Sequence, residues 1–463
     1  MANRWTTLDA GWRWAWQVGD AWCTHVGGQG AIAAMQELRR ESILAHALRH
    51  SRFYRARYAG LGSAPAHANL PPVRKAELMD AFDRWVTDPA VTLAGVRDFI
   101  ADPARIGEPY LGHYAVFSTS GTTGIPGLFV QDAPSLAVYD ALAATRLGAL
   151  APAGDAGHWL AGHRVALIAA TGGHFAGVVS WERLRAIHPG FARRSCIIPV
   201  TWPLAEVCRA LERFRPTVVA TYATMLRALA GEHEAGRLDL SPSVLWYGGE
   251  WLSPAARGEI QSSFGCRVAG DYGASEFMNI AFECELGELH LNADWVVLEP
   301  VDEKYRPVPP GHASATVLLT HLANRVQPLI RYELGDSVTM PAHGCPCGRP
   351  FPVIRVDGRR DESLGLEDGH GHERPVLPLA IATAIEEGAG VHRFQVVQVG
   401  AAKLAVRVDC PPGQARAALA RTRNALRAYL AAQGLGNVAF TVVNEKVAAH
   451  PVSGKFRQVW RES

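Results

Sequence analysis

A loop rich in glycine and hydroxyl side chains is the first segment of the sequence that could do chemistry. It comprises Ser118, Thr119, Ser120, Gly121, Thr122, Thr123 and Gly124, and Ile125-Pro-Gly127 follows it. The glycines let the backbone approach a ligand closely, and the hydroxyls with free N–H groups form a concave anion site. The loop lacks the Gly-Lys-Ser/Thr ending of a Walker A motif and carries no basic residue. A phosphate-binding loop is therefore one interpretation, and a plain surface loop is the other.

Three cysteines and a histidine form a second candidate group. Cys284 is followed by His290, and Cys345 is separated from Cys347 by one residue. Three thiolates and one imidazole suit a closed tetrahedral Zn²⁺ site. The Cys-x-Cys pair is strained as a disulfide. We therefore expect a structural zinc site, and the alternative is four unrelated buried side chains.

Composition and charge limit the class of protein. The chain has 463 residues, of which 48% are hydrophobic and 19% charged, so it is too apolar for intrinsic disorder and long enough for two or more domains. Its formal charge of +2 offers no basic excess for a nucleic-acid partner. We find no signal peptide and no membrane span, and eight cysteines do not form a disulfide framework. We expect a cytoplasmic enzyme with no nucleic-acid and no membrane partner.

Between about residues 114 and 273, short apolar runs that end in Gly, Ser or Thr alternate with helical patterns. The runs are Tyr114–Phe117, Arg164–Ile168, Thr217–Ala220 and Val244–Tyr247, and the helical pattern Pro203–Phe214 lies between two of them. This order predicts parallel sheets covered by helices. In such sheets the ligand binds beyond the carboxyl ends of the strands, where the glycine-rich turns fall.

The first hundred residues read as mostly helical, with a helical pattern of apolar residues over Glu37–Ala59. The tryptophan-rich opening is interpreted as a helix lying over the main domain, because Trp12 and Trp16 share one face; a lipid- or partner-binding helix is the alternative.

After about residue 358 the pattern changes. Phe394–Val399 and Lys403–Val408 read as a hairpin, Gln414–Gln433 as a helix and Val438–Val443 as a last strand. The predicted fold class is α/β: a large N-terminal domain (1–357, helical over about 1–100) of parallel and mixed sheets covered by helices, then a small mobile α+β lid (358–463).

Five motifs in a fixed order carry a family resemblance. They are the Ser118–Gly124 loop, Asp271-Tyr-Gly-Ala-Ser-Glu276, Leu329-Ile-Arg-Tyr-Glu-Leu-Gly-Asp336, Gly358-Arg-Arg-Asp361 and Ser453-Gly-Lys455. This set resembles the adenylate-forming superfamily of acyl-CoA synthetases, peptide-synthetase adenylation domains and luciferases. Within it the chain is most similar to the phenylacetate–CoA ligase branch, on four further segments: Tyr247-Gly-Gly-Glu250, Glu283-Cys284 with His290, Pro328-Leu-Ile-Arg-Tyr332 and Cys345-Pro-Cys-Gly-Arg349.

The resemblance implies an ATP-dependent, AMP-forming ligase. A carboxylate would attack the α-phosphorus of ATP, giving an acyl-adenylate and pyrophosphate, and CoA would then accept the acyl group. Since two anions must meet, catalysis would rest on positioning and charge neutralisation. ATP, Mg²⁺ and CoA are the implied cofactors, and an aromatic acid is implied by the branch.

The resemblance also assigns roles to residues. The Ser118–Gly124 loop would hold the β- and γ-phosphates, Glu276 would hold Mg²⁺, Arg359 would reach the ribose and phosphate, and Lys455 would bring its charge to the α-phosphate and the substrate carboxylate. The alternatives without a catalytic role are a helix cap for Glu276 and an exposed position near the C-terminus for Lys455. The remaining ATP- and AMP-binding residues would be Gly248, Gly249, Glu250, Asp271, Tyr272, Gly273, Ala274, Ser275 and Asp336.

Two further regions take their roles from the family. Asp361 would be the hinge about which the lid rotates between adenylation and thioester formation. The acyl pocket would be lined by His174, Phe175, Tyr222, Ala223 and Phe277. His174 is also compatible with ordinary core packing.

Three departures from the family pattern leave the acceptor open. Ile125 stands where relatives carry a lysine, so less positive charge faces pyrophosphate, and Glu333-Leu334 replaces an Arg-Thr pair. After Asp361, the polar segment Glu362–Pro375 replaces an Arg-Gly segment that contacts CoA. Alternative acceptors are a carrier-protein thiol or an amine, and the activated group could be a non-carboxylate anion such as nitrite. A nucleotide-binding pseudoenzyme is a third interpretation, and the oligomeric state, a homodimer included, stays open.

Overall fold

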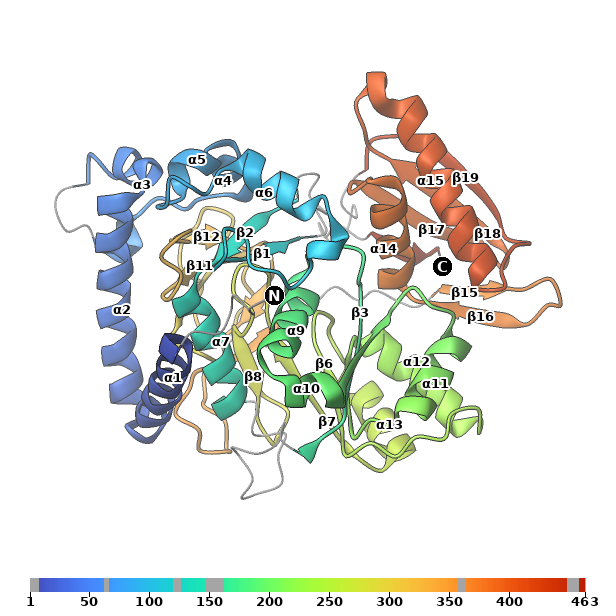
Figure 1. The fold of residues 1–463 in the computed structure, drawn as a ribbon, viewed down its shortest axis with the longest axis horizontal. Coiled ribbons are helices and arrows are strands. Elements are labelled where there is room, and N and C mark those ends of the chain that lie inside the picture. Colours follow the sequence, from blue (N-terminus) through green and yellow to red (C-terminus); the bar gives the residue numbers. More distant parts are fainter. Residues whose placement is uncertain are drawn as a thin grey trace.

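The computed structural model describes residues 8–61, 66–119, 126–146, 162–356, 364–447 and 458–462. Within them the chain forms a large α/β region and a smaller C-terminal α+β region, which lies at one side of the large one (Figure 1). This confirms the predicted fold class. The predicted domain boundary at residue 357 lies outside the described residues.

A nine-stranded sheet runs through the large region in the order β13-β14-β9-β8-β7-β6-β5-β3-β4. The neighbours β7-β6-β5-β3-β4 are parallel, and β8, β9, β14 and β13 extend the sheet antiparallel. The parallel strands are β3 Val165–Ala169, β4 Ser195–Pro199, β5 Val218–Thr221, β6 Val244–Tyr247 and β7 Arg267–Tyr272. The antiparallel strands are β8 Ala281–Glu283, β9 Leu289–Leu291, β13 Val338–Thr339 and β14 Val353–Val356. Strands covered on both faces read as continuous apolar runs, which is why three of the parallel strands were predicted.

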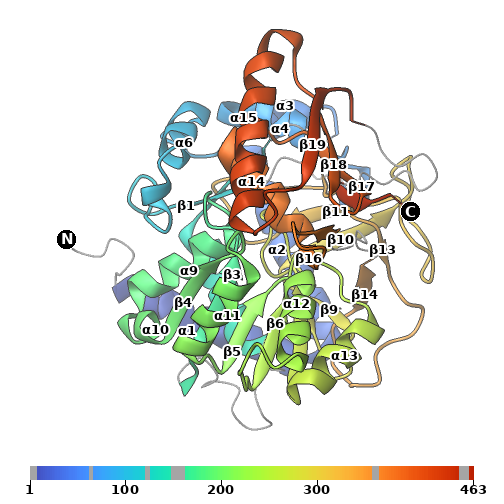
Figure 2. The same cartoon turned by 90° about the vertical axis from the view of Figure 1, so that its right-hand side faces the viewer.

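Helices cover this sheet, as Figure 2 shows for its parallel half. They are α9 Ala176–Ile187, α10 Pro189–Arg194, α11 Leu204–Phe214, α12 Ala223–Glu234 and α13 Pro254–Phe264. The predicted helix over Pro203–Phe214 is α11, which buries Val207, Cys208 and Leu211 on one face.

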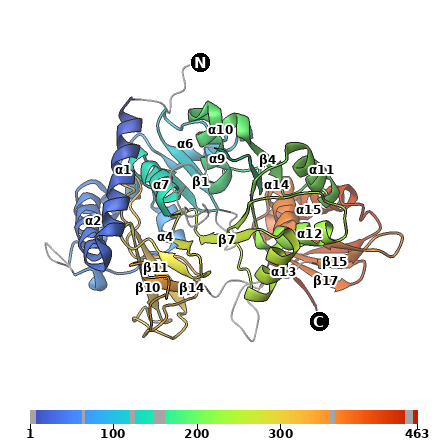
Figure 3. The same cartoon turned by 90° about the horizontal axis from the view of Figure 1, so that it is seen from below.

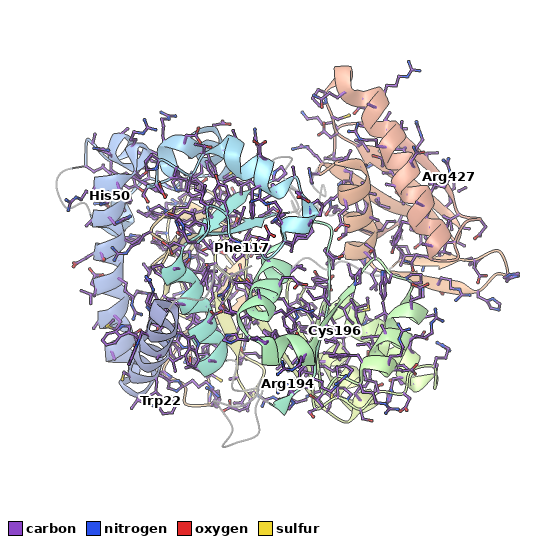
Figure 4. All side chains as sticks on the ribbon, viewed as in Figure 1. Trp22, His50, Phe117, Arg194, Cys196 and Arg427 are labelled. Carbon is purple, nitrogen blue, oxygen red and sulfur yellow. The ribbon has the colours of Figure 1, made fainter. Side chains whose placement is uncertain are left out.

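The predicted strand before the glycine-rich loop does not belong to the parallel sheet. It is β1, Ala115–Ser118, which pairs antiparallel with β2, Leu128–Gln131, in a separate two-stranded sheet. The connection between the two strands is too short for a parallel crossover, so the chain turns back on itself. Phe117 of β1 is completely buried and lies deep in the molecule (Figure 4).

A third sheet joins β10 Val296–Val301, β11 Thr316–His321 and β12 Tyr332–Glu333 in that order. The helix α7, Ala133–Arg146, contributes to the same hydrophobic core as these strands. β12 carries Tyr332, whose hydroxyl contacts the predicted site residue Glu276.

The described N-terminal residues are mostly helical, as predicted. The helices are α1 Leu8–Val26, α2 Gly28–His50, α3 Arg52–Arg57, η1 His67–Asn69, α4 Lys75–Asp80, α5 Phe82–Trp85, α6 Leu93–Ile100 and η2 Pro103–Arg105. The helical pattern over Glu37–Ala59 falls on α2 and α3, which Ser51 separates. Ser51 is extended, with φ −90° and ψ 119°, and its side chain accepts a hydrogen bond from the Tyr54 backbone, so it ends α2 and begins α3.

The tryptophan helix α1 lies against the large region, but not through the predicted face. Trp12 and Trp16 are 78% and 74% exposed. The opposite side packs instead: Ala21 is buried and Asp20 pairs with Arg39 of α2. Figure 3 shows α1 and α2 together at the end of the molecule away from the C-terminal region. Within the described part of the chain, no helix combines the length and apolarity needed to cross a membrane.

The C-terminal region contains a four-stranded sheet in the order β19-β18-β17-β20, a hairpin β15-β16 and two helices. Its elements are β15 Leu364–Glu367, β16 Glu373–Val376, α14 Pro378–Ala389, β17 Phe394–Gly400, β18 Lys403–Val408, α15 Pro412–Ala432, β19 Ala439–Asn444 and β20 Val459–Arg461. The predicted hairpin, helix and last strand correspond to β17, β18, α15 and β19. β20 and the β15–β16 hairpin were not predicted.

Candidate active site

The predicted nucleotide site begins where three neighbouring parallel strands end. Tyr222 follows β5, Gly248 follows β6 and Gly273 follows β7. Because these strands pair in register, their carboxyl ends meet at one edge of the sheet. The predicted residues after them are therefore neighbours in space.

The turn after β6 needs its glycines. The Gly248 N–H donates to the Thr221 carbonyl at 3.0 Å, and a Cβ on Gly248 would lie 2.9 Å from Asp271 Oδ1. Gly249 has φ +74°, a conformation that favours glycine. Glu250 is turned toward the start of α12, where its carboxylate accepts from the Thr224 N–H at 2.7 Å and from the Thr224 hydroxyl at 3.1 Å.

Asp271 is held by an indole that the sequence did not single out. The Trp246 Nε1–H donates to Asp271 Oδ1 at 2.7 Å. Part of Asp271 is exposed, but protein surrounds its carboxyl group. This desolvation raises the pKa of Asp271 to about 7, and the hydrogen bond from the indole opposes the shift. A carboxyl group with this pKa exchanges its proton near neutral pH.

Tyr272 and Asp336 meet although 64 residues separate them. The Tyr272 hydroxyl donates to Asp336 Oδ2 at 2.7 Å. Burial raises the pKa of Tyr272, and the charge of Asp336 adds to that shift. Two of the predicted ATP- and AMP-binding residues from distant motifs thus lie side by side.

Glu276 lies at the junction of β12 and the glycine-rich loop. It is 5% exposed, and its Oε1 accepts from the Tyr332 hydroxyl at 2.7 Å. Burial raises the pKa of Glu276, while the positive charge of Lys75 lowers it. The adjacent Ser275 hydroxyl donates to the Ser118 carbonyl at 3.4 Å, so the start of the loop lies beside this carboxylate.

Several predicted site residues lie outside the described part of the chain. They are Ser120, Gly121, Thr122, Thr123, Gly124, Arg359, Asp361 and Lys455. Their predicted roles stay predictions. Of the loop, Ser118 and Thr119 are described, and the Thr119 hydroxyl accepts from the Gly127 N–H at 2.7 Å.

The residues predicted for the acyl pocket occupy different surroundings. The Tyr222 hydroxyl accepts from the Ala170 N–H at 3.3 Å, and its ring faces Gly249; Ala223 begins α12 and Phe175 caps α9. His174 is 2% exposed, with its ring centroid 5.3 Å from that of Phe99.

Phe277 is fully buried between Tyr139 and His321, whose ring centroids lie 5.3 Å and 4.6 Å from its own. In this structure Phe277 and His174 therefore pack the core beside the site.

The four predicted zinc ligands come together in space. Their ligand atoms all lie within 4.8 Å of one another: Cys284 Sγ is 3.8 Å from Cys345 Sγ, and Cys347 Sγ is 3.3 Å from His290 Nε2. They come from the β8–β9 hairpin and from the turn that precedes β14. A tetrahedral site with Zn–S bonds of about 2.3 Å separates two sulfurs by roughly 3.8 Å.

The surroundings of this cluster also fit a metal. His290 Nδ1 lies 3.0 Å from the Phe351 carbonyl, which orients Nε2 toward the cysteines. Backbone N–H groups of Leu286, Cys347 and Arg349 point at the sulfurs of Cys284, Cys345 and Cys347 at 3.4 to 3.5 Å. The donor set and its supporting contacts match a structural Zn²⁺ site.

Several residues that build the site had no predicted role. Trp246 and Tyr332 each hold a predicted carboxylate, and Tyr332 lies inside a motif that was recognised only as a family marker. Behind the Gly248 turn, Glu283 pairs with Arg257 and accepts from the Gly270 N–H. A contact between side chains that lie far apart along the chain cannot be predicted from a single sequence.

Solved structures of acyl-CoA ligases match this chain over nearly its whole length, and the chain shares their fold. One of these neighbours is 2-hydroxyisobutyryl-CoA ligase. Its complex with 2-HIB-AMP and CoA in the thioesterification state aligns with a TM-score of 0.56 and 22% identity, covering 93% of this chain and 89% of that chain. Its postadenylation complex with R3-HIB-AMP gives 0.54 and 21%, covering 94% and 89%.

Sequence comparisons reach less far. Protein CapK of Staphylococcus aureus is 27% identical over 162 residues, which is 34% of this chain and 34% of that protein. The match thus spans about a third of the length of this curated relative. No family model matches the chain.

Proposed function

We propose that this protein is an ATP-dependent, AMP-forming acid ligase. It activates a carboxylic acid as an acyl-adenylate with release of pyrophosphate and transfers the acyl group to CoA. The observation that carries the proposal is the contact of Tyr272 with Asp336, of Ser275 with Ser118 and of Glu276 with Tyr332, beside the carboxyl edge of the parallel sheet. Both ATP and CoA are intracellular metabolites, so we place the activity in the cytoplasm.

The chemistry assigned to each residue follows from its atoms. Asp336 and Tyr272 offer oxygens to the ribose and a ring to adenine, and the Gly248 turn lets the backbone approach the base closely. Glu276 is a buried carboxylate beside the phosphate loop, which suits Mg²⁺, a cation that prefers carboxylate and phosphate oxygens. Mg²⁺ would neutralise charge on the phosphates. Arg359, Lys455 and the hinge at Asp361 keep the roles predicted from the family.

The substrate we propose is an aromatic acid, on the resemblance to the phenylacetate–CoA ligase branch. A small 2-hydroxy acid is the natural comparison compound, since it is named for the ligase with the same fold. We also propose that Cys284, His290, Cys345 and Cys347 hold a structural Zn²⁺ away from the reacting atoms.

A different acceptor is the second candidate function, on one specific observation. The polar segment that replaces the expected CoA-contacting one forms the β15–β16 hairpin, and Asp368 at its turn accepts from the backbone N–H groups of His370 and His372 and pairs with Arg374. Arg374 is thereby engaged within the hairpin. A carrier-protein thiol or an amine would then replace CoA.

The test is ATP–pyrophosphate exchange across aromatic acids and 2-hydroxyisobutyrate, followed by product mass with and without CoA. We expect acid-dependent exchange, and a thioester when CoA is added. Glu276→Gln should reduce exchange by about 100-fold or more, while Glu303→Gln, on an exposed turn, should not change it. Exchange without thioester would favour the second candidate, and no exchange with any acid would contradict the proposal.

A further inference from the structure

Glu283 is a buried acidic residue to which neither the family motifs nor the proposed chemistry gives a role. It is the last residue of β8, and it is 4% exposed. A buried carboxylate is costly unless hydrogen bonds and an opposite charge compensate it. The structure supplies three partners for this carboxylate, and each belongs to a different element beside the candidate active site.

The two oxygens of the Glu283 carboxylate hold these three partners together. Oε2 accepts from the Gly270 N–H of β7, and Oε1 pairs with Arg257 of α13 and accepts from the Tyr247 hydroxyl of β6 at 3.4 Å. Arg257 also donates to the Tyr247 hydroxyl at 3.0 Å and to the Val268 carbonyl of β7 at 2.8 Å. Ion-paired hydrogen bonds of this kind are stronger than neutral ones and fix the geometry of their partners.

The contact with Gly270 extends a short ladder between two strands. β7 and β8 form two backbone pairs, which involve Asp271 and Tyr272 of β7. Directly before them, the carboxylate of Glu283 binds the Gly270 N–H. A Cβ on Gly270 would lie 2.5 Å from the Tyr247 ring, so this ring lies close against the backbone of β7. The end of β6 and the end of β7 are thus packed onto each other at the carboxylate.

The groups that Glu283 holds come directly before two segments assigned to the nucleotide. Tyr247 precedes the turn at Gly248, and Gly270 precedes Asp271. The pairing of β8 with β9 in turn fixes the backbone at Glu283. A carboxylate on such a supported element can hold two strand ends at a constant separation.

We propose that Glu283 is a positioning residue for nucleotide binding, which fixes the ends of β6 and β7 relative to each other so that the segments after them fit the adenosine part of ATP. The inference rests on the proposed function and deepens it. Glu283 contacts neither the nucleotide nor the acid and acts through Gly270 and Tyr247. Because ATP and AMP share the adenosine part, the loss of Glu283 weakens the binding of both by the same factor.

The test compares ATP and AMP binding by calorimetry, with Mg²⁺ present, for the wild type and three variants. Glu283→Ala removes every contact of the carboxylate, and Glu283→Gln keeps an acceptor for the Gly270 N–H but loses the charge that pairs with Arg257. Glu288→Gln, in the same hairpin, is the matched control, because it breaks the pair of Glu288 with the exposed Arg355. We expect both nucleotides to bind about tenfold or more weakly to Glu283→Ala, about three- to tenfold more weakly to Glu283→Gln, and unchanged to Glu288→Gln.

The kinetics of ATP–pyrophosphate exchange distinguish positioning from a loss of stability. A protein that is only less stable contains less folded enzyme, so its kcat falls while its KM for ATP stays as in the wild type. A loss of nucleotide binding instead raises KM and leaves kcat nearly unchanged. For Glu283→Ala we expect the KM for ATP to rise about tenfold or more and kcat to change by less than about threefold.

The outcomes separate this inference from the proposed function. Wild-type affinity for both nucleotides in the Glu283 variants would overturn the role of Glu283, as would a loss that ATP and AMP do not share or a fall in kcat at constant KM. If Glu283→Ala does not fold, Glu283→Gln decides by the same criteria. A wild type that binds neither nucleotide would overturn the proposed function, and the role of Glu283 with it.

Discussion

Asp271 and Glu276 belong to one short motif, yet each carboxylate depends on a different distant partner. Asp271 accepts from the Trp246 indole and Glu276 from the Tyr332 hydroxyl. Burial raises the pKa of both groups. Keeping a desolvated carboxyl group hydrogen-bonded avoids the larger cost of leaving it without a partner. The neutral hydrogen-bond donors Trp246 and Tyr332 therefore contribute as much to the site as the two acidic residues of the motif.

Asp271→Asn should change how stability depends on pH. With its pKa raised from 3.8 to about 7, Asp271 keeps its proton in the folded state over a range where the unfolded chain has lost it. The free energy of unfolding should therefore fall as pH rises from about 4 to about 7, by on the order of 1–4 kcal/mol from this group. Asp271→Asn should reduce that fall, measured by urea unfolding between pH 4.5 and 8.

The control for this measurement is Asp98→Asn, a change at an exposed position of α6. It should leave the slope of stability against pH as in the wild type. Equal slopes for Asp271→Asn and the wild type would show that Asp271 is ionised in the folded protein across this range.

Individual elements were predictable where burial or composition alone determines them. β5 and β6 are apolar runs covered on both faces, and α11 has a clear apolar stripe, so their bounds were predicted to within a residue or two. The apolar periodicity over Glu37–Ala59 indicates helix but does not reveal the break at Ser51, whose side chain caps α3. Local hydrogen bonding at Ser51 outweighs the pattern.

The site was predictable as a set of strand ends and motifs, but not as a set of contacts. Gly248, Tyr222 and Gly273 follow strands that the sequence or the family order indicates. The pairing of Tyr332 with Glu276 depends instead on β12, a two-residue strand that no periodicity reveals, and on its register beside Val73. Such contacts follow from tertiary packing, which a single sequence does not display.

The cluster of three cysteines and His290 links two elements that share only short strands. The β8–β9 hairpin supplies Cys284 and His290, and the turn before β14 supplies Cys345 and Cys347. β9 and β14 pair through only two residue pairs, so this edge of the sheet has little hydrogen bonding of its own. A metal would hold the edge together and would add to the stability of the folded state.

Metal analysis of the purified protein should therefore find about one zinc per chain. The double variant Cys345→Ser, Cys347→Ser should lose it and unfold at a lower temperature, because the remaining donors cannot close a tetrahedral site. Cys410→Ser, in the C-terminal region, is the matched control and should keep both the metal and the stability. Well under one zinc in the wild type would contradict the assignment.

On the scale of the whole molecule, the C-terminal region touches the large region at the carboxyl ends of β3 and β4. The Gly172 N–H donates to Glu387 Oε1 of α14 at 2.7 Å, and Gln433 Nε2 donates to the Thr201 carbonyl at 2.9 Å. The preceding residue of α14, Glu386, accepts from Gln458 Nε2 at 3.2 Å, near the start of β20. α14 thus connects the segment after β3, which leads to the predicted pocket residue His174, with the last described segment of the chain.

The contact at Gly172 leaves no room for a side chain, which makes the arrangement of the two regions testable. A Cβ on Gly172 would lie 2.1 Å from the Glu387 carboxyl carbon, at the end of a flexible side chain, so Gly172→Ala should displace this carboxylate and break its hydrogen bond to the Gly172 N–H. We expect hydrogen exchange in α14 and in the segment after β3 to become faster, by up to about tenfold. Gly177→Ala is the matched control in the same segment, since a Cβ there meets no atom within 4 Å.

Glu387→Ala, alone and combined with Gly172→Ala, completes a double-variant cycle for this contact. Alone it removes the same hydrogen bond as Gly172→Ala and should increase exchange to a similar extent. Combined with Gly172→Ala it removes the carboxylate that the new methyl group would strike, so the double variant should exchange no faster than Glu387→Ala alone. Additive effects of the two substitutions would show that they act independently, and the Gly172–Glu387 contact would not be what holds α14 against the large region.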